Sequence, residues 1–187
     1  MTDTSTQQVT TMASCAKRRL FVDIETYSST DIKAGAFKYF EDPAFEILLL
    51  PYAWNDEPVR VLDLYDPADR EELPDIISGL LDPDVLKIAH NNAFERGAYR
   101  RQFGHYMPPE EWDDTMILAA MNGLPMSLEA AGEALRLPQQ KLKEGKLLIN
   151  YFCKPCKPTI ANGGRTRNLP EHAPDKWATF CEYCRRD

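Results

Sequence analysis

The stretch Leu20-Phe21-Val22-Asp23-Ile24-Glu25-Thr26 places two carboxylates directly after three apolar residues. On a β-strand, side chains two residues apart lie on one face, roughly 7 Å apart along the strand. Because a carboxylate on a core face needs a positive partner, Asp23 and Glu25 predict a divalent metal held by oxygen ligands. The alternative is an edge strand that ends in solvent, since Asp-x-Glu alone is a weak motif.

The composition predicts one domain. A chain of 187 residues with 43% hydrophobic content can bury one core, which we place in residues 18–187 after a polar, disordered leader of residues 1–17. No apolar run approaches the ~20 residues of a membrane span, so we expect no membrane partner. Five cysteines without a secretion signal indicate a reducing, cytoplasmic location.

The charge is unevenly distributed. The net charge of −7 argues against nucleic acid, which proteins usually bind through Lys and Arg. Residues 136–167, however, hold eight basic residues and one acid, for a charge of +7, which leaves −14 elsewhere. This segment is typical of a basic track beside an acidic metal site, and equally of a solvated loop.

The hydrophobic pattern predicts an α/β fold. Residues 45–54 and 59–64 are expected to form a hairpin beside the first strand, so that three antiparallel strands open the domain. A helix over residues 73–81, with Asp69 as a possible cap, leads to a parallel strand over residues 85–89. Later helices are expected over residues 113–121, with Met116 and Met121 in the core, over 127–135, and over 174–187.

Polar residues follow the predicted strand 85–89, where open α/β sheets place their sites. Asn91 and Glu95 stand four apart at the start of a helix, so Glu95 is a candidate third metal-facing carboxylate. His90 is better explained as a structural residue than as a ligand. Tyr183 and Asp187 share one face of the last helix, and Asp187 supplies a fourth acid.

This ordered set of motifs resembles the three exonuclease motifs of the DEDD superfamily. Asp23-x-Glu25, Asn91-x-x-x-Glu95 and Tyr183-x-x-x-Asp187 carry the resemblance, which extends from about Arg19 to the last residue. More narrowly, the chain is similar to the 3'-5' proofreading exonuclease domain of bacteriophage-type family A DNA polymerases. Tyr183, where other members have His, favours the tyrosine branch.

The resemblance implies a ribonuclease-H-like fold and hydrolysis of the terminal phosphodiester at a single-stranded DNA 3' end. Four carboxylates can hold two Mg²⁺ ions, which Mn²⁺ can replace, for an in-line displacement. By similarity, Asp23, Glu25, Glu95 and Asp187 are the ligands and Tyr183 orients the attacking water. Thr26, Asn91 and Phe94 would bind the substrate strand. The partner is a polymerase domain or a separate polymerase subunit.

The sequence departs from this family in two places. The second motif ends in Glu95, where the best-known members have Asp, which lengthens the side chain by one methylene. The chain also ends at Asp187, so we expect a fragment of a longer polymerase, a split gene product, or a site that binds metal weakly.

Two alternatives remain from the sequence. The pairs Cys153-x-x-Cys156 and Cys181-x-x-Cys184 approach a four-cysteine zinc module, although the second pair also fits the apolar stripe of the last helix, and we favour zinc less. The other alternative keeps the fold and replaces DNA by RNA, because relatives in the superfamily trim RNA 3' ends with the same carboxylates.

Overall fold

The computed structural model describes residues 17–137 and 145–186. A six-stranded mixed sheet has the order β2-β3-β1-β5-β6, with β4 also paired to β3. Its strands are β1 (Arg18–Val22), β2 (Glu25–Tyr27), β3 (Glu46–Trp54), β4 (Arg60–Asp63), β5 (Val85–Ala89) and β6 (Trp112–Asp114). The helices are α1 (Ala36–Glu41), α2 (Pro67–Arg70), α3 (Leu73–Leu81), α4 (Asn92–Phe103), α5 (Thr115–Met121), α6 (Leu128–Ala134), α7 (Gly145–Phe152) and α8 (Pro174–Arg186), with 3-10 turns at Ile32–Ala34, Pro109–Glu111 and Pro170–His172.

The predicted antiparallel opening is confirmed. β3 pairs antiparallel with β1, with Leu20 opposite Trp54, and with β4, with Leu50 opposite Leu62. Asn55 forms the turn after β3 in a left-handed conformation, with φ of 51°. Asparagine tolerates this region better than most residues. This turn lies beside the start of β1, where the Asn55 amide donates to the Arg19 carbonyl at 2.9 Å.

The first strand is interrupted, contrary to the prediction of one continuous strand. β1 ends at Val22, β2 begins at Glu25, and the register against β3 shifts between Glu25 and Thr26. The Asp23 amide still donates to the carbonyl of Pro51, at 3.0 Å. Burial also continues to alternate through the break, because Val22 and Ile24 are buried whereas Asp23 and Glu25 are half-buried. The two acids therefore point away from Val22 and Ile24, which belong to the apolar cluster that contains Leu20.

The parallel crossover is confirmed, with two corrections around it. β5 runs parallel to β1, pairing Arg18 with Val85 and Phe21 with Ile88. The capping residue before this crossover is Asp66 on the short helix α2, and the Asp69 carboxylate instead accepts from the amide of Asp63. Residues 113 and 114, the first two of the helix predicted over 113–121, belong instead to β6, which pairs parallel to β5, and the helix begins at Thr115.

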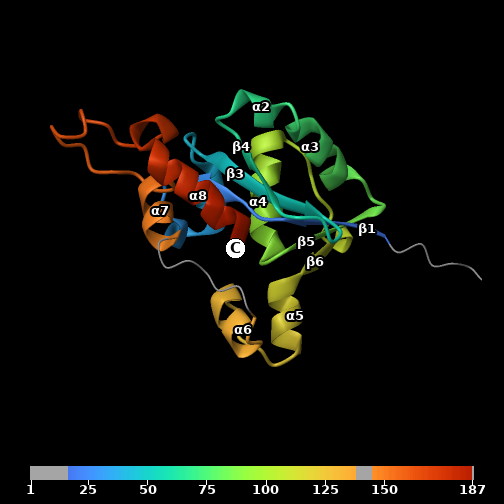
Figure 1. Ribbon diagram of the computed structural model, residues 1–187. Helices are drawn as coiled ribbons and strands as arrows, with labels where there is room; N and C mark the ends of the chain where they lie inside the picture. Colours follow the sequence, from blue (N-terminus) through green and yellow to red (C-terminus); the bar gives the residue numbers. More distant parts are fainter. Residues whose placement is uncertain (1–16, 138–144, 187) are drawn as a thin grey trace, which may run out of the picture.

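Helices cover both faces of the sheet (Figure 1). One apolar cluster joins the sheet to α1, α3 and α4, and includes the fully buried Leu20 and Leu80. The second joins β3 to α7 and α8, and includes Phe152 and Phe180. Within the described ranges, none of the helices is both long enough and apolar enough to cross a bilayer.

Helices α5 and α6 stand away from the sheet (Figure 1). Met121 is 77% exposed, so the prediction that it belongs to the core is wrong, and Met116 is only half-buried. His90 links this pair of helices to the end of β5. Its two ring nitrogens lie 3.0 Å from the Thr115 hydroxyl and 2.9 Å from the Met126 carbonyl oxygen.

Candidate active site

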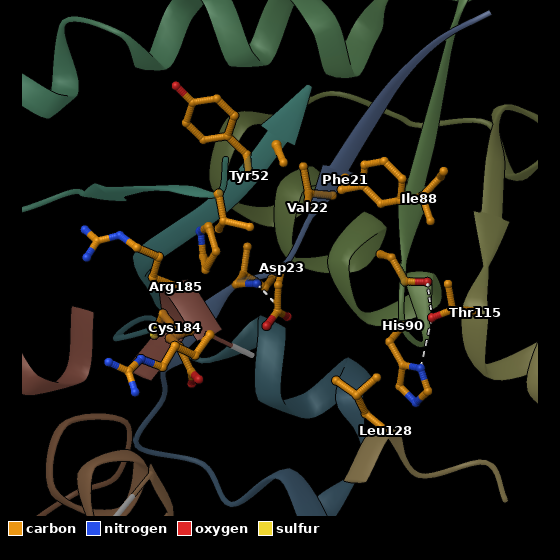
Figure 2. Close-up of a pocket in the computed structure, with 17 residues that line it drawn as sticks. Phe21, Val22, Asp23, Tyr52, Ile88, His90, Thr115, Leu128, Cys184 and Arg185 are labelled. Carbon is orange, nitrogen blue, oxygen red and sulfur yellow. Dashed lines mark hydrogen bonds between the residues drawn. The ribbon is translucent and has the colours of Figure 1, made fainter. Parts of the chain in front are cut away.

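The first acid of the opening stretch lines a cavity of about 440 Å³, here called the Asp23 cavity. It lies at the carboxyl ends of β1 and β5 (Figure 2), where the strand order places side chains from distant parts of the chain together. An Asp23 carboxylate oxygen accepts from the Ile24 amide at 2.8 Å. Its wall includes Asp23, Glu25 and Cys184.

Glu95 is a buried carboxylate in the first turns of α4. Its side chain is 4% exposed, and its Oε2 has no hydrogen-bond partner within residues 17–137 and 145–186. Burial, followed by the negative charges of Asp23 and Asp114, raises the pKa of Glu95 to about 9. Glu95 does not line the Asp23 cavity, but the negative charge of Asp23 contributes to its raised pKa.

The position of Glu95 depends on Asp114, which the sequence reasoning did not assign to the site. The carboxylate of Asp114 accepts from the amides of Asn91 and Asn92, at 3.0 and 2.9 Å, and also from the Met116 amide at 2.9 Å. It thereby caps α5 and fixes the beginning of α4. Asn91 adopts a left-handed conformation there, with φ of 68°, and its side chain is exposed. The available signal was an aspartate directly before the helix Thr115–Met121, in the position of an N-cap.

Glu25 also borders a second cavity of about 530 Å³, here called the Thr26 cavity. Two predicted substrate-binding residues, Thr26 and Phe94, line it. The Thr26 hydroxyl is 2.9 Å from the hydroxyl of Tyr39, which is itself a buried residue. The cavity wall also includes Lys154 and the hydroxyl residues 28–30. Glu25 therefore lies between two cavities, one lined by Asp23 and the other by Thr26.

Helix α8 brings its last turns to the same acids. Burial, and then the charges of Glu25 and Asp23, raise the pKa of the Cys184 thiol far above its usual range. Tyr183 is 1% exposed and stacks on Phe180, with ring centroids 6.2 Å apart. The close approach of Gly145 leaves no room for a side chain there, because an added Cβ would lie 2.1 Å from the Tyr183 ring. Asp187, the fourth predicted ligand, lies outside the described residues.

The described residues do not by themselves form a closed metal centre. Among them, no three His, Cys, Asp or Glu side chains are arranged to hold one ion, which applies both to the predicted carboxylates and to the predicted zinc cysteines. The Cys153 thiol contacts Glu25, and the Cys156 thiol donates to the Arg165 carbonyl at 3.3 Å. What the structure brings together is Asp23 with Glu95, and Cys184 with Asp23 and Glu25.

Part of the predicted basic track is used inside the fold. Arg167 donates to Glu46 at 2.6 Å and to the Tyr65 hydroxyl at 2.8 Å, and its guanidinium lies 3.9 Å from the ring centre of Tyr27. Residues 138–144 lie outside the described residues. By contrast, Lys154 borders the Thr26 cavity and is exposed. Within this segment, Arg167 therefore stabilises the fold, whereas Lys154 lies in the wall of the Thr26 cavity.

Comparison with known proteins gives one similar sequence and several similar folds. No protein-family model matches the chain. A DNA polymerase of Bacillus phage SP02 is 46% identical over 172 residues, which cover 91% of this chain. The chain spans only 26% of the length of that curated relative.

Two solved structures of Trypanosoma brucei RNase D share the fold. The complex with GMP has a TM-score of 0.55 and 17% sequence identity, and the match covers 91% of this chain and 48% of that one. The complex with RNA U12 has a TM-score of 0.51 and 19% identity, and the match covers 90% of this chain and 53% of that one. The mixed sheet flanked by helices is therefore the ribonuclease-H-like fold of these exonucleases, as the motifs predicted.

Proposed function

We propose that this chain, which has the ribonuclease-H-like fold of the DEDD exonucleases and resembles a phage DNA polymerase over 91% of its length, is a metal-dependent 3'-5' exonuclease acting on DNA. The observation that carries the proposal is the buried carboxylate of Glu95 beside Asp23. A buried carboxyl group with an oxygen that lacks a partner among the described residues costs stability unless it serves a positive ligand.

The donor set fits Mg²⁺. All the acids in question offer oxygen, which Mg²⁺ prefers, and Oε2 of Glu95 lacks a partner among the described residues. Asp23, Glu25 and Glu95 would hold the ions, together with Asp187. Two such ions, when bound, would activate a water and stabilise the leaving oxygen of the displacement. The positive charge of bound ions would also lower the pKa of Glu95, so that Glu95 would bind as a carboxylate.

The protein's own residues supply binding and orientation. The Thr26 cavity opens beside Glu25 and is large enough for a nucleotide, since small-ligand pockets range over about 300–1,000 Å³. In it the ring of Phe94 offers an apolar surface for the terminal base, and Lys154 offers a positive charge for a phosphate. Asn91, exposed at the start of α4, would contact the same strand. Tyr183 would orient the attacking water from α8.

The experiment that tests this proposal compares two substrates. Single-stranded DNA and RNA oligonucleotides of one sequence, labelled at the 5' end, are incubated with the chain and Mg²⁺, or with a chelator. We expect stepwise shortening of DNA from the 3' end that requires the metal. Faster shortening of RNA would replace DNA by RNA as the substrate. No metal-dependent shortening of either would refute the proposed activity.

We also propose that the chain works with a polymerase, either in the same polypeptide or as a separate subunit. The supporting observation is that the similar DNA polymerase is much longer than the matched 172 residues. Proofreading requires that a 3' end leave one site and reach another. Mixing the chain with a polymerase that lacks proofreading, and measuring removal of a mismatched 3' nucleotide, tests this partnership.

A further inference from the structure

Cys153 is a buried residue beside the site that the proposed chemistry does not use. It follows directly after α7 and its side chain is 6% exposed. Its Sγ lies 3.7 Å from Oε2 of Glu25, with the thiol as the donor. This contact joins β2 to a segment 128 residues later in the chain. Both residues also border the Thr26 cavity.

The surrounding structure holds this thiol in place. The Cys153 amide donates to the Ile149 carbonyl at 2.8 Å, which continues the last turn of α7. The Asn168 side chain donates to the Tyr151 carbonyl at 3.0 Å and anchors the same turn. The preceding residue, Phe152, is 1% exposed and packs edge-on against Trp177 with ring centroids 4.9 Å apart. These contacts hold the backbone at Cys153 in place, and its side chain is part of the second core cluster.

We propose that Cys153 is a positioning residue for Glu25, holding its carboxylate in the orientation that binds the divalent cation. This inference rests on the proposed function, because it takes Glu25 as a metal ligand. Hydrogen-bond partners of metal ligands fix ligand orientation, and their loss typically lowers metal affinity by roughly 10–100-fold. A thiol is a weak donor, so it orients the carboxylate and leaves its negative charge available to the metal.

The test measures metal binding and catalysis separately in four variants. Cys153→Val and Cys153→Ala remove the donor, the first with little change in volume, and Cys153→Ser keeps a donor. Cys156→Ser is the matched control, because this nearby thiol donates to the Arg165 carbonyl instead of an acid. Mn²⁺ titration without DNA gives the affinity, and 3' shortening of DNA over a range of Mg²⁺ concentrations gives the metal requirement.

We expect Cys153→Val and Cys153→Ala to weaken Mn²⁺ binding about 10-fold and to raise the half-saturating Mg²⁺ concentration by a similar factor. The rate at saturating metal should change little, and Cys153→Ser should recover most of the affinity. Wild-type affinity in both donor-lacking variants, or equal losses in Cys156→Ser, would overturn the inference. If the wild type binds Mn²⁺ but shortens no DNA, the proposed function fails while the titration still decides the role of Cys153.

Discussion

Replacing Glu95 by Gln should stabilise the metal-free protein at alkaline pH. The folded-state pKa of Glu95 is about 9 and its ordinary value is 4.5, so the folded protein holds a proton that the unfolded chain loses. When folding raises the pKa of an acid, its contribution to stability is complete below the pKa of the unfolded chain. This contribution falls as the pH rises towards the pKa of the folded state. At about 1.4 kcal/mol for each pKa unit, the free energy of unfolding falls by about 4 kcal/mol between about pH 5 and about pH 8.

The assay is urea unfolding in a chelator at several pH values, followed by tryptophan fluorescence. Gln has no proton to lose, so the Glu95→Gln variant should lack this component of the pH dependence. The difference in unfolding free energy between variant and wild type should therefore grow by about 4 kcal/mol from about pH 5 to about pH 8. At the higher pH, Mg²⁺ should restore the free energy of unfolding of the wild type and leave that of the variant unchanged. Parallel pH profiles for the two proteins would refute the reasoning.

Three further predictions concern neighbouring residues. Asp23→Ala should abolish exonuclease activity, measured by DNA shortening, and should lower the pKa of Glu95, because it removes the neighbouring negative charge. Gly145→Ala should cost about 1–3 kcal/mol in urea unfolding and reduce DNA shortening, since its Cβ would meet the Tyr183 ring. Hydrogen bonds, of which the one from Ser29 has the largest effect, hold the pKa of Asp42 well below its usual range. Asp42 therefore stabilises the fold fully above about pH 4, and this stabilisation decreases as the pH falls. Asp42→Ala should therefore lose about 1–3 kcal/mol at neutral pH and less in acid, which unfolding at both pH values checks.

The sequence predicted the central strands well, because their signals are local. Residues 85–89 are short, apolar and bounded by turn residues, and they form β5 at these limits. The last helix begins at Pro174 and buries Trp177 and Phe180, as its apolar stripe predicted. In both places the hydrophobic period and the flanking residues indicate the same structure.

The sequence could not predict features that depend on distant partners. The register of the first strand against β3 continues to the pair of Glu25 and Leu49 and shifts only between Glu25 and Thr26, and a residue pattern of period 2 does not reveal such a shift. Met121 lies on an apolar helix face and was expected to be core, yet α5 projects from the sheet and leaves it exposed. The sequence did not predict helix α7, because its apolar stretch is short and lies among basic residues.

The candidate site was predictable as a set of residue types and only partly as an arrangement. The motif order predicts that Asp23 and Glu95 converge on one site, and the charge of Asp23 contributes to the raised pKa of Glu95. The roles of Asp114 and Cys153 depend on contacts across 22 and 128 residues, which a single sequence does not specify. Metal ligation by Asp23, Glu25, Glu95 and Asp187 stays a prediction.

The most direct measurement is a crystal structure of the chain grown with Mn²⁺, with anomalous diffraction recorded at the manganese absorption edge. If these residues bind the metal, we expect an anomalous peak between the carboxylates of Asp23 and Glu95, at roughly 2.0–2.3 Å from an oxygen of each. A map without a peak at these two residues, or with manganese bound only elsewhere on the protein, would contradict it.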